Sequence, residues 1–178
     1  MVCEVPPDRP LLTAQEPTTE PNKDLAVIER DKDFLFQLPP SYHYTPARLK
    51  TIVSQLDSGR RNVVEFRHSS WWNEKVYSAF KAHGVIFCSC SGPKLPDTIV
   101  NTADDIYIRF HGTEKWYRHN YSKEEMAEWA QRIHDCGASQ VWAYFNNDND
   151  GYAIKNAREL LSRLKQLRVA IMGRSISP

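Results

Sequence analysis

The feature that most constrains the fold of this chain is a rhythm of short β-branched and aromatic runs that alternate with stretches of helical period. This rhythm is typical of βα units arranged around a parallel sheet. The runs predict five strands, over residues 34–38, 62–67, 85–89, 105–111 and 140–146. The sequence therefore indicates an α/β protein with about five parallel strands.

Helix-start signals lie between these strands. Thr45 followed by Pro46 predicts a first helix, because proline at the first helical position loses no donor that the helix needs. Asn73 predicts the cap of a second helix, and residues 122–125 form a capping box for a third. A last helix is expected over about residues 152–167. Its expected apolar face consists of Ile154, Ala157, Leu161 and Leu164.

Polar residues recur on one side of the predicted strands. Glu65 and Arg67 alternate with apolar residues in the second strand, and Arg109 and His111 do so in the fourth. A parallel sheet covered by helices on both faces should be apolar on both, so a repeated polar face predicts an enclosed interior, as in a barrel with helices on its outer face. The polar residues gather toward the C-terminal strand ends, where α/β barrels place their ligand sites.

Composition divides the chain near residue 24. Residues 1–24 hold five of the eleven prolines, with scattered Thr and Glu and no repeated apolar face, which predicts a disordered tail. Residues 25–168 are expected to form the α/β domain, and residues 169–178 a C-terminal tail. A length of 178 residues suits one sizeable core.

Charge and hydropathy exclude some classes of partner. The chain has 23 Lys and Arg against 22 Asp and Glu, so no strong overall field attracts nucleic acid or a membrane surface. No apolar run approaches the ~18 residues of a membrane span, and the N-terminus does not resemble a signal peptide. We therefore expect a cytoplasmic protein without a membrane partner.

The cysteines and common motifs give little indication of a cofactor. Cys3, Cys88, Cys90 and Cys136 lack CxxC spacing and a neighbouring histidine cluster, so neither a zinc site nor a disulfide framework is indicated. A Gly-rich phosphate loop, a GxSxG elbow and an HExxH helix are missing from the sequence. We expect reduced thiols, no metal and no cofactor.

Several runs, taken in order, resemble the YecE-like family, domain of unknown function 72. The runs are FLFQLPPSY, VVEFRHSSWW, YIRFHG and YFNND, followed by AIKNA, and they are collinear over about residues 31–167. The resemblance implies a TIM-barrel-like fold and no established reaction. The GTSGW-type and EINxTFY-type strands of the family's first half are not found before Phe34. Because a full barrel needs about 250 residues and eight strands, the resemblance implies a partial barrel that corresponds to the C-terminal half.

A partial barrel has consequences for partners. An unclosed sheet leaves two strand edges that pair with other chains unless they are covered. Three interpretations stay open: a gene fragment, a half-barrel that self-associates or pairs with a complementing N-terminal half, or an open-sheet domain. The chain also reads CSCSGP over residues 88–93, where many family members have an acidic residue, and this weakens a metal hypothesis.

Charged residues at the strand ends are the first site candidates. Glu65 and His111 are the catalytic candidates for proton transfer, and Arg67 and Arg109 are planar donors suited to phosphate or carboxylate. His111 precedes Gly112, where the backbone can approach a ligand closely. The alternatives are an internal salt-bridge network for the charged groups and a structural hydrogen bond for the histidine.

Further ligand-binding candidates are amide, acidic, imidazole and aromatic side chains near the strand ends: Gln37, His68, Trp71, Tyr117, Tyr121, Asn146, Asn147 and Asp148. The aromatic residues offer surfaces for a base or a sugar, with helix packing as the alternative. An Asx turn is the alternative for the last three. The sequence thus predicts a site for a small anionic ligand or nucleotide, in a phosphoester-processing enzyme or in a noncatalytic nucleotide-binding or nucleic-acid-binding module.

Overall fold

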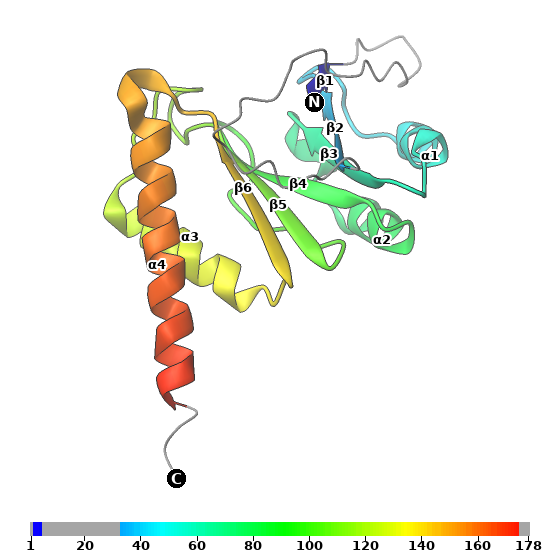
Figure 1. Cartoon of the computed structure of the whole chain (residues 1–178). Coiled ribbons are helices and arrows are strands. Elements are labelled where there is room, and N and C mark those ends of the chain that lie inside the picture. Colours follow the sequence, from blue (N-terminus) through cyan, green and yellow to red (C-terminus); the bar gives the residue numbers. More distant parts are fainter. Residues whose placement is uncertain (1, 5–32, 175–178) are drawn as a thin grey trace, which may run out of the picture. The chain divides into compact units, whose positions relative to one another are not determined.

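The computed structural model describes residues 2–4 and 33–174. These residues form strands that pair in parallel in the order β1-β2-β3-β4-β5-β6, with the helices between them (Figure 1). The strands are β1 (Val2–Glu4), β2 (Asp33–Leu38), β3 (Arg61–Phe66), β4 (Ile86–Ser91), β5 (Asp105–Phe110) and β6 (Gln140–Phe145). The helices are α1 (Pro46–Gln55), α2 (Glu74–Ala82), α3 (Lys123–Asp135) and α4 (Tyr152–Arg174), with short 3-10 turns η1 (Ser69–Trp71) and η2 (Asn149–Gly151). The five predicted strands and the α/β class are confirmed, and within the described residues the sheet does not close.

The chain divides into two compact units, Met1–Phe87 and Cys88–Pro178, with the boundary inside β4. In the first unit, β2 pairs with β3 over their full length, from Asp33 opposite Arg61 to Leu38 opposite Phe66. This pairing places Gln37 directly opposite Glu65. The first unit therefore contains β1, β2, β3 and the start of β4, and α1 and α2 supply buried apolar side chains to its core.

The second unit consists of the end of β4, β5, β6, α3 and α4. Ile106, Ile108 and Phe110 of β5 form a buried core with residues of α3 and α4. By strand alternation, Tyr107 and Arg109 lie on the opposite face of the same strand. As the sequence predicts, the apolar side of β5 packs against the helices of this unit. Figure 1 shows α3 and α4 together beside β5 and β6.

The three predicted helix starts are confirmed. The side chains of Thr45 and Asn73 accept hydrogen bonds from the third residue beyond each cap. Ser122 and Glu125 form the reciprocal capping box at the start of α3. Local side-chain chemistry therefore sets these boundaries.

The predicted apolar face of α4 is only partly confirmed, since Leu164 packs against the buried core of the second unit. Ile154 and Leu161 are 60% and 52% exposed, whereas Ala153, Asn156 and Leu160 are buried. The buried face of α4 includes the polar Asn156, because its side chain hydrogen-bonds to the Tyr121 carbonyl inside the unit. The spacing of hydrophobic residues in the sequence does not indicate that a polar residue is buried there. This rotates the helix relative to the expectation.

Both predicted tails contain regular structure where the model describes them. Residues 2–4 form β1 inside the segment expected to be disordered, and α4 extends through residues 169–174 of the expected C-terminal tail. The rest of that prediction, over residues 5–24 and 175–178, lies outside the described residues. No helix in the described ranges has the length and apolar character needed to cross a bilayer.

Candidate ligand site at the strand ends

In the first unit, three of the predicted site residues form one hydrogen-bonded cluster. Arg67 forms an ion pair through Nε with Glu65 Oε1 and donates from Nη2 to Gln37 Oε1 at 2.9 Å. The Glu65 side chain is fully buried. A buried carboxylate in a direct ion pair is stabilised in its charged form, so this geometry is that of the internal salt bridge, the alternative to a catalytic base.

His68 lies in the loop that follows β3. Its Nδ1 accepts a hydrogen bond from the backbone of Ser70 and thereby caps η1. The ring stacks on His43 with a centroid separation of 3.8 Å. These contacts hold the loop in place, and the His68 side chain is only half-buried.

Trp71 was expected to offer a stacking surface to a ligand, but its side chain lies in the core. It is fully buried, it stacks on Phe66 at 4.1 Å, and its indole N–H donates to the Tyr42 carbonyl at 2.6 Å. Both ring face and polar edge are occupied by the protein. Packing, the alternative considered from the sequence, is therefore what the geometry shows for Trp71.

In the second unit, the predicted residues gather around the ends of β5 and β6. Arg109 is 8% exposed, and its Nε donates to Asn146 Oδ1 at 3.0 Å. On the same face, Tyr107 of β5 stacks on Tyr144 of β6 at 4.8 Å. Tyr144 is 45% exposed, so the stack has an accessible edge. Burial, and then the proximity of Tyr144, raise the pKa of Tyr107, which keeps its hydroxyl neutral at physiological pH.

His111 and Gly112 begin the loop after β5. The buried His111 donates its backbone N–H to Ser91 at 2.8 Å and accepts from the Tyr117 backbone N–H at 2.6 Å. The His111 ring lies 5.4 Å from that of Trp116 and 5.9 Å from that of Tyr117. Tyr117 has a left-handed backbone, φ 67°, and is 48% exposed. The loop thus folds back over the strand end and brings aromatic rings to His111.

Tyr121 and Asn147 support this loop from inside. The Tyr121 hydroxyl accepts from Gly112 N at 2.9 Å and donates to Ser91 Oγ at 2.8 Å, and burial raises its pKa. Asn147 is fully buried and donates to the His119 carbonyl at 2.8 Å and to Asn156 Oδ1 at 2.7 Å. Both were expected as ligand contacts, yet the Tyr121 hydroxyl and the Asn147 amide nitrogen bond to groups of the protein itself. Of the residues predicted at the end of β6, only Asp148 has an exposed side chain.

Gly112 has a conformation that other residues adopt only under strain. Its φ is +100°, and a Cβ built there would lie 2.6 Å from the Lys115 carbonyl oxygen. We expect Gly112→Ala to lower the free energy of unfolding by about 1–3 kcal/mol, because strain and a backbone clash add together. Gly137→Ala is the matched control, since Gly137 has φ +68° with open space around its Cβ. Urea denaturation measures the free energy of unfolding of both variants. An equal decrease in the two would show that the backbone relieves the clash at Gly112 at no cost.

Sequence reasoning missed three residues of this region as site members. Tyr107 and Tyr144 follow the same two-residue period as Arg109, and this alternation was the signal available for them. Asn156 lies in the AIKNA run, and the hydrophobic periodicity of a helix does not predict that an asparagine is buried. Its hydrogen bonds to Tyr121 and Asn147 are visible only in three dimensions.

Parallel strands with helices on one face and polar residues at the C-terminal strand ends define a TIM-barrel-like α/β protein. The family model described as protein of unknown function DUF72 matches residues 16–176, so the chain belongs to the DUF72 family, which is the YecE-like family. No curated protein matches the chain.

Solved DUF72 structures are similar to the model. One from Thermotoga maritima has 27% sequence identity and a TM-score of 0.67, over 75% of this chain and 58% of that protein. Two structures of a DUF72 protein from Enterococcus faecalis have 20% and 22% identity, with TM-scores of 0.64 and 0.63, and support the fold alone. Each of these two alignments includes 75% of this chain, and they include 58% and 61% of the Enterococcus faecalis chains. The chain therefore spans about three fifths of the solved relatives that it matches.

Proposed function

We propose that this chain binds a small anionic ligand, carrying a phosphate or a carboxylate, at the C-terminal ends of β5 and β6. The observation that carries the proposal is the buried guanidinium of Arg109, whose Nε is bound by the neutral amide oxygen of Asn146. The amide oxygen of Asn146 orients the guanidinium at the end of β5. The planar fork of an oriented arginine matches paired phosphate or carboxylate oxygens.

Arg67 contributes less to this proposal than the sequence suggested. It forms an ion pair with Glu65 and also donates to Gln37, so its charge has a protein partner. A ligand anion would have to compete with a buried carboxylate for the same guanidinium. The proposal therefore depends on Arg109 alone.

The aromatic residues favour a ligand with a flat group attached to its anion. The Tyr107–Tyr144 stack lies on the same strands as Arg109, and the register places Tyr144 opposite Arg109. Exposed tyrosine rings stack on bases and sugars with little dependence on sequence. A mononucleotide is thus the probe that uses both kinds of contact.

Calorimetric titration of the whole chain with inorganic phosphate, adenosine monophosphate and acetate tests the proposal. We expect binding that weakens as salt concentration rises, and Arg109→Leu should weaken it about tenfold or more, as loss of a charged hydrogen bond does. Arg118→Leu is the control, because Arg118 is an exposed arginine in the loop after β5. Its affinity should stay within about twofold of the wild type.

Two results would overturn the proposal. One is that none of the three probes binds the folded wild-type chain. The other is that Arg109→Leu and Arg118→Leu lose affinity equally, which would mean diffuse attraction to positive charge. Arg109→Gln keeps the side-chain polarity and serves as a second variant if the leucine variant does not fold.

Two more specific functions fit the proposal, and different measurements distinguish them. A noncatalytic nucleic-acid module would bind a short single-stranded oligonucleotide more tightly than the mononucleotide and with a steeper salt dependence. A phosphoester-processing enzyme would need a proton-transfer group, and His111 is the candidate, since imidazole nitrogens can donate and accept protons. A complementing half-barrel, or a second copy of the chain, would serve either form by supplying further strand ends.

A further inference from the structure

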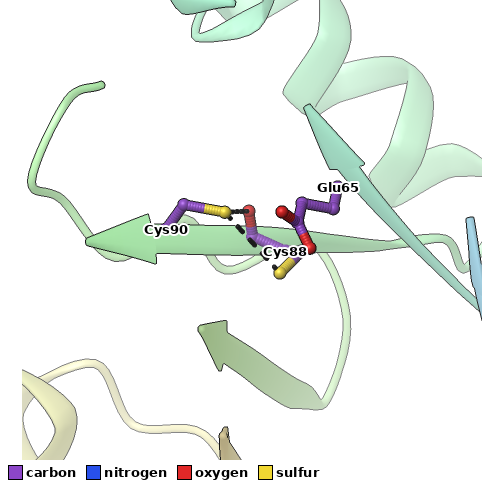
Figure 2. A group of neighbouring side chains, drawn as sticks. All are labelled: Glu65, Cys88 and Cys90. Carbon is purple, nitrogen blue, oxygen red and sulfur yellow. Dashed lines mark hydrogen bonds between the residues drawn. The ribbon is translucent and has the colours of Figure 1, made fainter. Parts of the chain in front are cut away.

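A pair of cysteines in β4 is a further candidate site. Cys88 and Cys90 are two residues apart in an extended strand, so both side chains project from the same face. Their sulfur atoms lie 3.9 Å apart, and both residues are fully buried (Figure 2). The strand backbone thus holds two thiols side by side.

Two contacts of these thiols are with backbone carbonyls of β4. Cys90 Sγ contacts the Cys88 carbonyl at 3.6 Å, and Cys88 Sγ lies 3.9 Å from the Ser89 carbonyl. Thiols are poor donors and acceptors, so such contacts contribute little. The 3.9 Å separation is also nearly twice the ~2.04 Å of a disulfide bond, and the pair is reduced.

The sulfur separation matches what a tetrahedral thiolate complex requires. With metal–sulfur bonds of ~2.3 Å, as zinc has, two sulfurs 3.9 Å apart subtend an angle of about 116° at the ion. The ideal tetrahedral angle is about 109°. A metal could therefore be chelated with little movement of the strand.

The charge balance suits a buried position. A divalent cation displaces one proton from each thiol, so that M²⁺ plus two RSH gives M(SR)₂ plus two H⁺. The product has no net charge, which avoids burying an uncompensated ion. Thiolates select soft or borderline metals such as Zn²⁺ over Mg²⁺ or Ca²⁺. Water or a small ligand would fill the two remaining tetrahedral positions.

We propose that Cys88 and Cys90 form a chelating site for a thiophilic divalent cation of the zinc class. This differs from the expectation from the sequence, where the absence of CxxC spacing argued against a metal. In a strand, residues two apart project together, and a CxC pair can present both sulfurs to one ion. The ligands of this site are sulfur atoms rather than the Arg109 guanidinium, although Arg109 lies opposite Cys90 in the register of β4 and β5.

Titration of the reduced, full-length chain with Cd²⁺ tests the proposal. We expect one Cd²⁺ per chain, a sulfur-to-metal charge-transfer band in the ultraviolet, and a higher melting temperature, since a ligand that binds the native state stabilises it. Cys88→Ala and Cys90→Ala should each weaken binding about a hundredfold or more and remove the band, as loss of half the thiolate donors implies.

Cys136→Ala is the matched control, because Cys136 lies outside the pair, at the end of α3, with its Sγ donating to the Ile133 carbonyl at 3.0 Å. It should bind Cd²⁺ as the wild type does. Absence of Cd²⁺ binding by the wild type, or equal loss in Cys136→Ala, would overturn the proposal. If the Cys88 and Cys90 variants do not fold, alkylation of the wild-type cysteines with and without Cd²⁺, measured by mass spectrometry, tests the site instead. Cd²⁺ should then protect Cys88 and Cys90, and protection at other cysteines alone contradicts the site.

Discussion

Replacing Arg67 with methionine is expected to lower the free energy of unfolding by about 3–5 kcal/mol, because the variant leaves the buried Glu65 carboxylate without its ion-pair partner. The Arg67 side chain is only 9% exposed and that of Glu65 is fully buried, so water cannot readily replace the lost contact. Chemical denaturation with matched slopes measures the loss. The effect is large because an isolated buried charge is costly, and it does not mean that the ion pair itself is very stabilising.

The double variant Glu65→Leu/Arg67→Met separates these two contributions. Removing both charges should restore most of the stability that the single variant loses, since apolar replacements of a buried pair are often close to neutral. Arg60→Met is the surface control. Its ion pair with Asp57 is exposed, and we expect a change of less than about 1 kcal/mol. A single Arg67→Met variant as stable as the wild type would show that the pair is not buried in solution.

Truncating Trp71 to alanine is expected to cost about 3–5 kcal/mol, because the substitution opens a cavity in the core and removes a stacked aromatic ring. The side chain is fully buried and stacks on Phe66 at 4.1 Å. Thermal and urea denaturation of the whole chain measure the change. A variant that loses ligand affinity with no loss of stability would contradict the packing role and support the stacking role predicted from the sequence.

Tyr117→Ala gives the matched comparison, because Tyr117 is another aromatic residue proposed as a ligand contact. It is 48% exposed, and we expect its truncation to change the free energy of unfolding by less than about 1 kcal/mol. The two aromatic residues are thus expected to differ severalfold in their effect on stability. Similar losses in both variants would mean that the loop of Tyr117 is part of the folding core.

Much of the local structure was predictable because its causes are close in sequence. The capping box at Ser122 and Glu125 and the caps at Thr45 and Asn73 depend on atoms three residues apart. Alternation within β5 was also predictable, since period two places Arg109 opposite the buried Ile108 and Phe110 side. The exposed and buried faces of α4 were not, because the burial of Asn156 depends on hydrogen bonds to a residue 35 positions away.

The candidate site shows the same division. From the sequence alone, each of Glu65, Trp71 and Tyr121 had a functional and a structural interpretation, because residue type does not reveal which partner a side chain reaches. Contacts between segments distant along the chain decided among them, such as the hydroxyl of Tyr121 against Ser91, 30 residues earlier. For Arg109, the contact that supports the proposal is with Asn146, 37 residues later.

By itself, the sequence determined the α/β class, the positions of the strands, the helix caps and the family resemblance, since these follow from local periodicity, capping chemistry and ordered motifs. Only the tertiary structure decided which polar groups bond to one another, which arginine lies beside Asn146, and which aromatic rings are buried. The tertiary structure also gave the distance of 3.9 Å between the sulfur atoms of Cys88 and Cys90. Their short separation in the sequence did not predict this distance. The physical reason is that hydrogen-bond partners, burial and chelate geometry depend on side-chain positions in space, and most of these are set by packing between segments far apart in the chain.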